Sequence, residues 1–204
     1  MTQEDTAKQL WIQFRDELVR ELNSTLVDAF TKAWSSTPER TRFYRHDIFP
    51  RVALQLGLEL QAEWPGRIDF AMVKPAEQVP LAIIESENDA RSAVYNEIPK
   101  LCCFAGPLKA FLTCDEWDET PGVWSHGGRR SRHLNAWAPI IRAHATAWPQ
   151  PSVLSIIAAE WNNSNWLTFY ALVFDCRTGG VWEPVQADPE KWQDSVIFQR
   201  NMRP

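Results

Sequence analysis

Several features that commonly mark a membrane, secreted or zinc-binding protein are missing from this chain of 204 residues. Its apolar runs are far too short for a transmembrane helix, which needs about 20 residues, and its polar, acidic start does not resemble a signal peptide. The cysteines form no Cys-x-x-Cys spacing and no His-x-x-x-His pair occurs, which argues against a zinc site. We therefore expect a cytoplasmic protein without membrane contact, and mostly buried free thiols at Cys102, Cys103, Cys114 and Cys176.

Other absences exclude several classes of protein function. The chain holds no internal repeat, and none of the Gly-x-Ser-x-Gly, P-loop and dinucleotide fingerprints occurs in it. Its net charge is −5, so any nucleic-acid contact must come from a local basic patch. The 45% apolar content is enough for one packed core. We expect residues 1–204 to form a single domain.

Apolar periodicity and turn residues predict an α/β (α+β) fold with a central mixed sheet flanked by helices. A single apolar stripe predicts a long helix from about Glu4 to Trp34. A short helix at 51–57 is expected next, with Asp47 as its N-cap and Gly57 as its stop. The remaining expected elements are strands at 58–64, 67–73 and 79–87, a helix at 88–104, a strand at 108–114, a helix at 131–148, and strands at 152–161 and 166–175.

Three acidic residues belong to this pattern. Asp69 lies on the second predicted strand, and Glu85 and Glu87 lie on the third, in Ile-Glu-Ser-Glu-Asn. Alternating strand residues share a face, so Glu85 and Glu87 point the same way. A carboxylate cluster costs free energy unless a cation compensates it, and hard oxygen donors suit Mg²⁺ or Mn²⁺. Solvated acids on a hairpin edge are the alternative.

The order helix, three-stranded meander, helix, strand resembles the core of the PD-(D/E)xK nuclease superfamily, with its restriction endonuclease-like fold. That pattern has an Asp on the second strand, matched by Asp69, and an acid-x-Lys on the third, matched in its acid by Glu85. The resemblance covers about residues 40–115. It implies that Asp69 and Glu85 bind Mg²⁺ or Mn²⁺, with the backbone carbonyl of Ser86 as a further ligand. The flanking parts would then be an N-terminal helical extension and a C-terminal β-rich addition.

The Lys position of the motif holds Glu87 instead. Some restriction enzymes of the superfamily carry Glu there and remain active. In others the Lys comes from the following helix, where Lys100 is the candidate. The third alternative is a degenerate site that binds without cutting. The helix before the meander often adds an acid, for which Glu63, Asp47 and Glu39 are open choices.

Basic residues gather in two places. No acid occurs at positions 120–159, a stretch that includes Arg129, Arg130 and Arg132 after Gly127-Gly128. Arginine suits phosphate contact, so these three and Arg91 are candidate DNA-binding residues, although a solvated helix face and an N-cap at Asn88 explain the same residues. A second cluster, Arg40, Arg42, Arg45 and Arg51, either lines a cleft or pairs with acids on the first helix.

The expected function is a metal-dependent nuclease that hydrolyses DNA phosphodiester bonds, with Asp69, Glu85, Glu87 and Lys100 as catalytic residues. The alternative is an inactive nuclease-fold protein used for nucleic-acid or protein binding. A third hypothesis is that the chain is an interaction protein whose acidic residues are surface groups. DNA is the expected partner, and assembly as a homodimer stays open.

Overall fold

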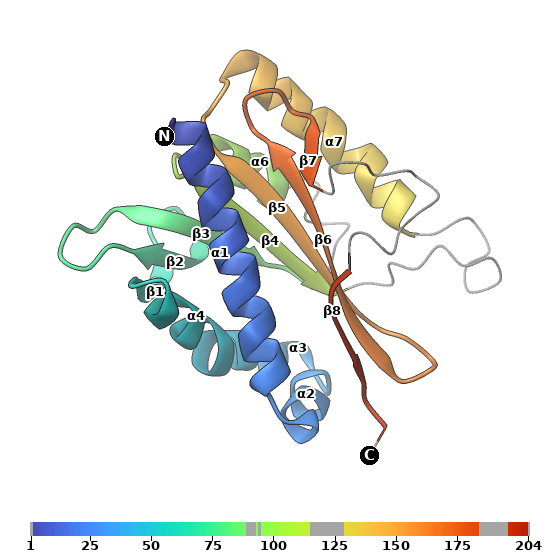
Figure 1. The fold of residues 1–204 in the computed structure, drawn as a ribbon. Coiled ribbons are helices and arrows are strands. Elements are labelled where there is room, and N and C mark those ends of the chain that lie inside the picture. The colour runs from blue at the N-terminus through green and yellow to red at the C-terminus, as the bar shows by residue number, and fades with distance from the viewer. Residues whose placement is uncertain (1, 89–92, 94, 115–128, 184–195, 204) are drawn as a thin grey trace.

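The sheet that organises this protein has eight strands and mixed direction (Figure 1). The computed structural model describes residues 2–88, 93, 95–114, 129–183 and 196–203. The strands are β1 (Glu59–Trp64), β2 (Ile68–Val73), β3 (Pro80–Ser86), β4 (Leu108–Cys114), β5 (Val153–Trp161), β6 (Trp166–Asp175), β7 (Val181–Glu183) and β8 (Val196–Asn201). They follow one another from β1 to β7, and β8 pairs with β6 beside β7. The mixed α/β architecture with a central sheet is confirmed.

The three-stranded antiparallel meander predicted from the sequence is present as β1, β2 and β3. Its first turn contains Gly66 in the left-handed region, as Pro65-Gly66 suggested. From β3 the chain crosses to β4, which lies parallel to it, and β5 is parallel to β4. The crossover contains helix α6 (Glu97–Cys103). The carboxyl ends of these three strands therefore face one edge of the sheet.

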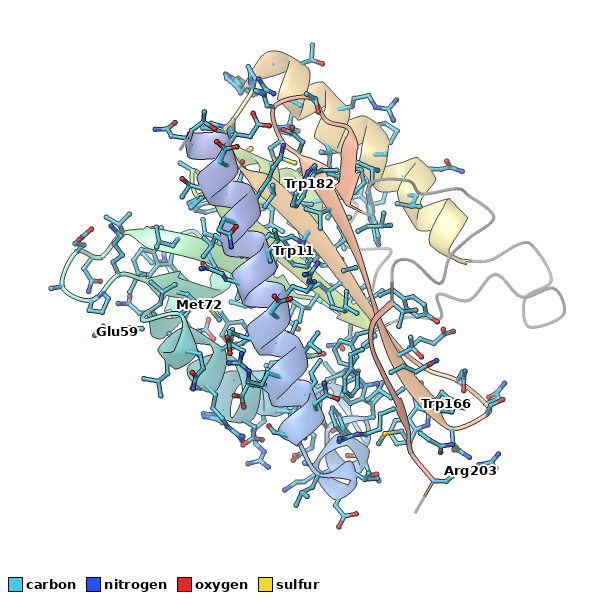
Figure 2. All side chains as sticks on the ribbon, in the orientation of Figure 1. Trp11, Glu59, Met72, Trp166, Trp182 and Arg203 are labelled. Carbon is cyan, nitrogen blue, oxygen red and sulfur yellow. The ribbon has the colours of Figure 1, made fainter. Side chains whose placement is uncertain are left out.

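Helices from the first quarter of the chain cover one face of the sheet. They are α1 (Gln3–Ser24), α2 (Val27–Ala33), α3 (Thr37–Arg42), the π-helix η1 (Phe43–Ile48) and α4 (Phe49–Gln55). Trp11 on α1 and Met72 on β2 belong to the same buried cluster, and Figure 2 marks both. Figure 1 shows α1 running across the sheet.

The opposite face is covered by α6 and α7 (Arg129–Ala147). Trp137 of α7 packs edge-on against Phe111 of β4, with ring centroids 5.8 Å apart. Ile98 and Leu101 of α6 complete this second core. Both Glu85 and Lys109 project toward this side, because they alternate in phase with Ile83 and Phe111.

Three helix predictions need correction. The long helix expected at 4–34 is broken, since the hydroxyls of Ser24 and Thr25 bond to the Glu21 carbonyl and α2 starts afresh after Leu26. Asp47 does not cap α4, because it lies inside η1 and the capping position is Ile48. The helix expected at 88–104 contains turn residues at 95–96 before α6 begins.

Candidate functional site at the ends of β2 and β3

Asp69 and Glu85 meet across the β2–β3 pair. The register pairs Phe70 with Ile84, so continuing it by one residue sets Asp69 opposite Glu85. Side chains directly opposite in an antiparallel pair share a face, with Cβ atoms about 4.5–5.5 Å apart. Asp69 Oδ2 also accepts a hydrogen bond of 2.8 Å from the main-chain N–H of Ser86. The two acids that the sequence singled out are therefore neighbours.

Lys100 reaches into the same place from α6. Its Nζ lies 2.8 Å from Glu85 Oε1 and 2.5 Å from Glu97 Oε2. It also donates to the carbonyl of Arg67, just before β2, at 3.0 Å. One ammonium group thus joins α6 to both strands of the acidic site.

Burial raises the pKa of both strand acids. Glu85 is only 2% exposed. Burial raises its pKa to about 8, a rise that the hydrogen bond from Lys100 limits and that Asp69 increases. Burial likewise raises the pKa of Asp69, against the bond from Ser86 N–H. For Lys100, burial lowers the pKa, but the bonds to Glu85 and Glu97 outweigh it and the pKa is raised.

The site offers two neighbouring carboxylates, Asp69 and Glu85, as donors that could hold a divalent cation. Within the part of the chain that the structure describes, no group of three or more His, Cys, Asp or Glu side chains is arranged to hold a metal ion. Mg²⁺ in phosphoryl-transfer sites is commonly held by one or two carboxylates, with waters and substrate oxygens completing the shell. Asp69 and Glu85 supply two such carboxylates, and burial raises the pKa of each.

For the other residues predicted for this site, the structure shows fewer contacts with Asp69 and Glu85. Ser86 is at the site through its main-chain N–H. Glu87 follows the last residue of β3, is half-buried, and donates its main-chain N–H to Leu112 O at 3.0 Å. Arg91 lies outside the described residues. The catalytic and metal-binding roles of all these residues stay predictions.

Sequence reasoning missed the Glu97 side chain and the contact between Arg40 and Asn88. Glu97 brings a third carboxylate to the site by its ion pair with Lys100. Its spacing of three residues from Lys100 on a helix could have predicted this pair. Arg40 donates its Nε to Asn88 Oδ1 at 2.6 Å, two residues beyond the end of β3. Its guanidinium carbon also lies 5.7 Å from the ring centroid of Trp34. No periodic pattern connects residues so far apart in the chain.

The remaining arginines of the second cluster pair with acids, but only Arg51 pairs with an acid on the first helix, the alternative given for the cluster. Arg42 bonds to Glu39, Arg45 to Glu63, and Arg51 to Glu21 on α1. Glu39 and Glu63, both considered as extra metal ligands, are thus engaged by arginines. For the first cluster, Arg129, Arg130 and Arg132 lie in the first turns of α7, and their side chains are outside the described part.

Comparison with known proteins gives no relative: no family model, no curated protein and no solved structure matches this chain. Among the residues described, no helix is long and apolar enough to cross a bilayer.

Proposed function

We propose that this protein is a Mg²⁺- or Mn²⁺-dependent nuclease acting on DNA, with a PD-(D/E)xK-type site at the ends of β2 and β3. One observation carries the proposal. Two adjacent strand carboxylates, the half-buried Asp69 and the buried Glu85, share their site with a lysine from the next helix. The strand order around β1, β2, β3 and β4 supports a restriction endonuclease-like core.

In this proposal, the site residues have three roles: binding the metal ion, orienting the attacking water and contacting the DNA. Asp69 and Glu85 would hold the ion, with the Ser86 carbonyl as a further ligand. A bound Mg²⁺ would supply an acidified water and stabilise charge on the pentacovalent phosphate. Lys100 is suited to orient the attacking water, because its ammonium already contacts Glu85. Glu87 remains the alternative for that role. Arg91, Arg129, Arg130 and Arg132 would contact the DNA backbone.

A second candidate function is binding without cleavage on the same fold. It is favoured by the position of Lys100, whose ammonium lies between Glu85 and Glu97 where a cation would otherwise compensate the acids. A glutamate with a pKa of about 8 is also largely protonated at neutral pH, which weakens it as a metal ligand.

Cleavage assays separate the two functions. The wild-type protein is incubated with linear, supercoiled and single-stranded DNA, each with Mg²⁺ or Mn²⁺. We expect cleavage that Asp69→Asn and Glu85→Gln each reduce by at least about 100-fold, since a lost ligand leaves the ion under-coordinated. Glu59→Gln, an exposed acid at the start of β1 (Figure 2), is the matched control and should retain full activity.

Circular dichroism on each variant checks that the fold is retained. Unchanged cleavage in either acid variant would remove the assignment. If the wild type cuts none of the three DNA forms with either metal, the binding-only function is supported instead. If the wild type does cut DNA, Lys100→Met decides the role of position 100. Loss of cleavage with metal binding kept identifies Lys100, and unchanged cleavage transfers the role to Glu87.

A further inference from the structure

A second site lies under the α6–α7 layer, around a lysine that the proposed nuclease chemistry does not use. Lys109 of β4 is 0% exposed. Lys109 is among the residues that line a small cavity of about 10 Å³, together with Cys102, Ile141, His144, Trp148, Gln150 and Cys176. That volume admits about one water-sized group.

The charge of Lys109 is left without an anion. Its ammonium donates to a neutral oxygen, Gln150 Oε1, at 2.5 Å, and no acidic side chain in the described ranges forms an ion pair with it. Burial lowers the pKa of Lys109. Burial also raises the pKa of Cys102 to about 12, so this thiol supplies no negative charge at neutral pH. A buried lysine with only neutral neighbours favours its neutral amine, and an anionic partner would favour the ammonium.

A larger cavity adjoins this small one. It has a volume of about 600 Å³, within the usual range for small-molecule sites, and is lined by Cys102, Cys103, Ala147, Trp148, Pro149 and Gln150. Three residues line both spaces: Cys102, Trp148 and Gln150. Trp148 is 68% exposed, unusual for an indole, and therefore offers an open apolar surface at the mouth.

We propose that these adjoining cavities bind a small-molecule monocarboxylate with an apolar body. One carboxylate oxygen takes the place of Gln150 Oε1 as acceptor for the Lys109 ammonium, and the apolar body lies against Trp148 and Pro149. A monoanion matches the single uncompensated charge. The Gln150 side chain is the gate, since its other contact is a hydrogen bond of 3.3 Å to the Cys102 carbonyl.

Calorimetric titration with a matched pair of probes tests this site. The probes are 4-phenylbutyrate and its neutral isostere 4-phenylbutanamide, both at pH 7. Wild-type protein should bind the acid at least about tenfold more tightly than the amide. Lys109→Met keeps the side-chain volume and should abolish that preference, whereas Lys74→Met, on the exposed loop after β2, should leave it intact. Trp148→Ala should weaken both probes by a similar factor.

The wild-type comparison needs no variant, so it decides the matter even if Lys109→Met fails to fold. Equal binding of acid and amide, or binding of neither at millimolar concentration, overturns the proposal. A tenfold preference that survives in folded Lys109→Met also overturns it. None of these outcomes depends on Asp69 or Glu85, so the proposal stands or falls independently of nuclease activity.

Discussion

The protonation state of Glu85 determines the charge of the acidic site. Glu85 is buried beside a second carboxylate, yet Lys100 contacts it with a full positive charge. An ammonium at 2.8 Å and a carboxylate opposite act in contrary directions on its pKa, and burial decides the result. The pKa of Glu85 is therefore raised despite the neighbouring ammonium.

This protonation predicts a pH dependence of stability. The folded-state pKa of Glu85, about 8, lies above its ordinary value of 4.5. Between these values the native state binds more protons than the unfolded state, so the free energy of unfolding falls as pH rises. Glu85→Gln is neutral throughout and should lose this dependence. We expect its melting temperature to exceed that of the wild type by roughly 3–6 °C at pH 8 and to match it near pH 5.

Scanning calorimetry at pH 5, 6.5 and 8 measures the difference. Glu59→Gln, changed at an exposed position, should follow the wild-type curve. If Glu85→Gln loses stability with pH as the wild type does, Glu85 is ionised in the folded protein across the whole range.

At the scale of elements, the turn between β1 and β2 is tied to the end of α6. Gly66 has φ of +84°, and a Cβ there would lie 2.4 Å from Cζ of Phe104. Phe104 directly follows α6, the helix that carries Lys100. This contact helps to fix the distance between the acidic strands and their lysine.

A pair of glycine variants isolates that contact. Gly57 also has a positive φ, of +68°, but a Cβ there would meet nothing within 4 Å. Gly57→Ala should therefore cost only the backbone strain, about 1 kcal/mol. Gly66→Ala should cost about 1–3 kcal/mol more, because the Phe104 ring must move. Urea unfolding measures both, and equal losses would show that the ring yields freely.

Elements with strong local signals were predictable from the sequence. The meander was marked by alternating residues and by Pro65-Gly66, and β5–β6 by the asparagine-rich turn at 162–165. Strand β4 was predicted with the bounds that the structure has. Asp69 and Glu85 followed from the same register argument.

What escaped prediction depends on tertiary contacts. The apolar stripe continues through Ser24 and Thr25, yet their hydroxyls compete for the Glu21 carbonyl and end α1. β8 was not predicted from the mixed C-terminal sequence and is defined by its pairing with β6. The contacts Lys100–Glu85 and Arg40–Asn88 join segments that are distant in the sequence, and no local sequence pattern predicts them.

For the molecule as a whole, a metal that binds only the native state should raise stability. Binding at 100 times the dissociation constant adds about 2.7 kcal/mol to the free energy of unfolding. We expect melting temperature to rise with millimolar Mn²⁺ or Mg²⁺, less so in Glu85→Gln. Lys100→Met should show a larger rise than the wild type, because its ammonium no longer competes for Glu85. Differential scanning fluorimetry with Ca²⁺-free buffers measures this, and a flat response to both metals would leave the acids as ordinary buried carboxylates.

Positive charge is concentrated at the start of helix α7. Helix α7 begins with Arg129, Arg130 and Arg132 and has no acid in its first turn, an arrangement that the helix dipole disfavours unless anions are near. If these arginines contact phosphates, the triple Ala variant should bind DNA more weakly at all sequences. Each lost contact should reduce the slope of log affinity against log salt by about 0.9 for duplex DNA.

Fluorescence anisotropy with labelled duplexes of two unrelated sequences, at low and at moderate salt, measures both quantities. The matched control removes three exposed charges elsewhere, Arg20, Lys32 and Lys74, and thereby changes the net charge equally. A purely global charge effect would lower affinity in both triple variants alike, whereas a local phosphate contact lowers it in the α7 variant alone. Stabilisation by metal should persist in that variant, because Asp69 and Glu85 are unchanged. Wild-type affinity in the α7 variant at both salt concentrations would mean that the start of α7 is a solvated helix surface, and that DNA, if bound, is held by other residues.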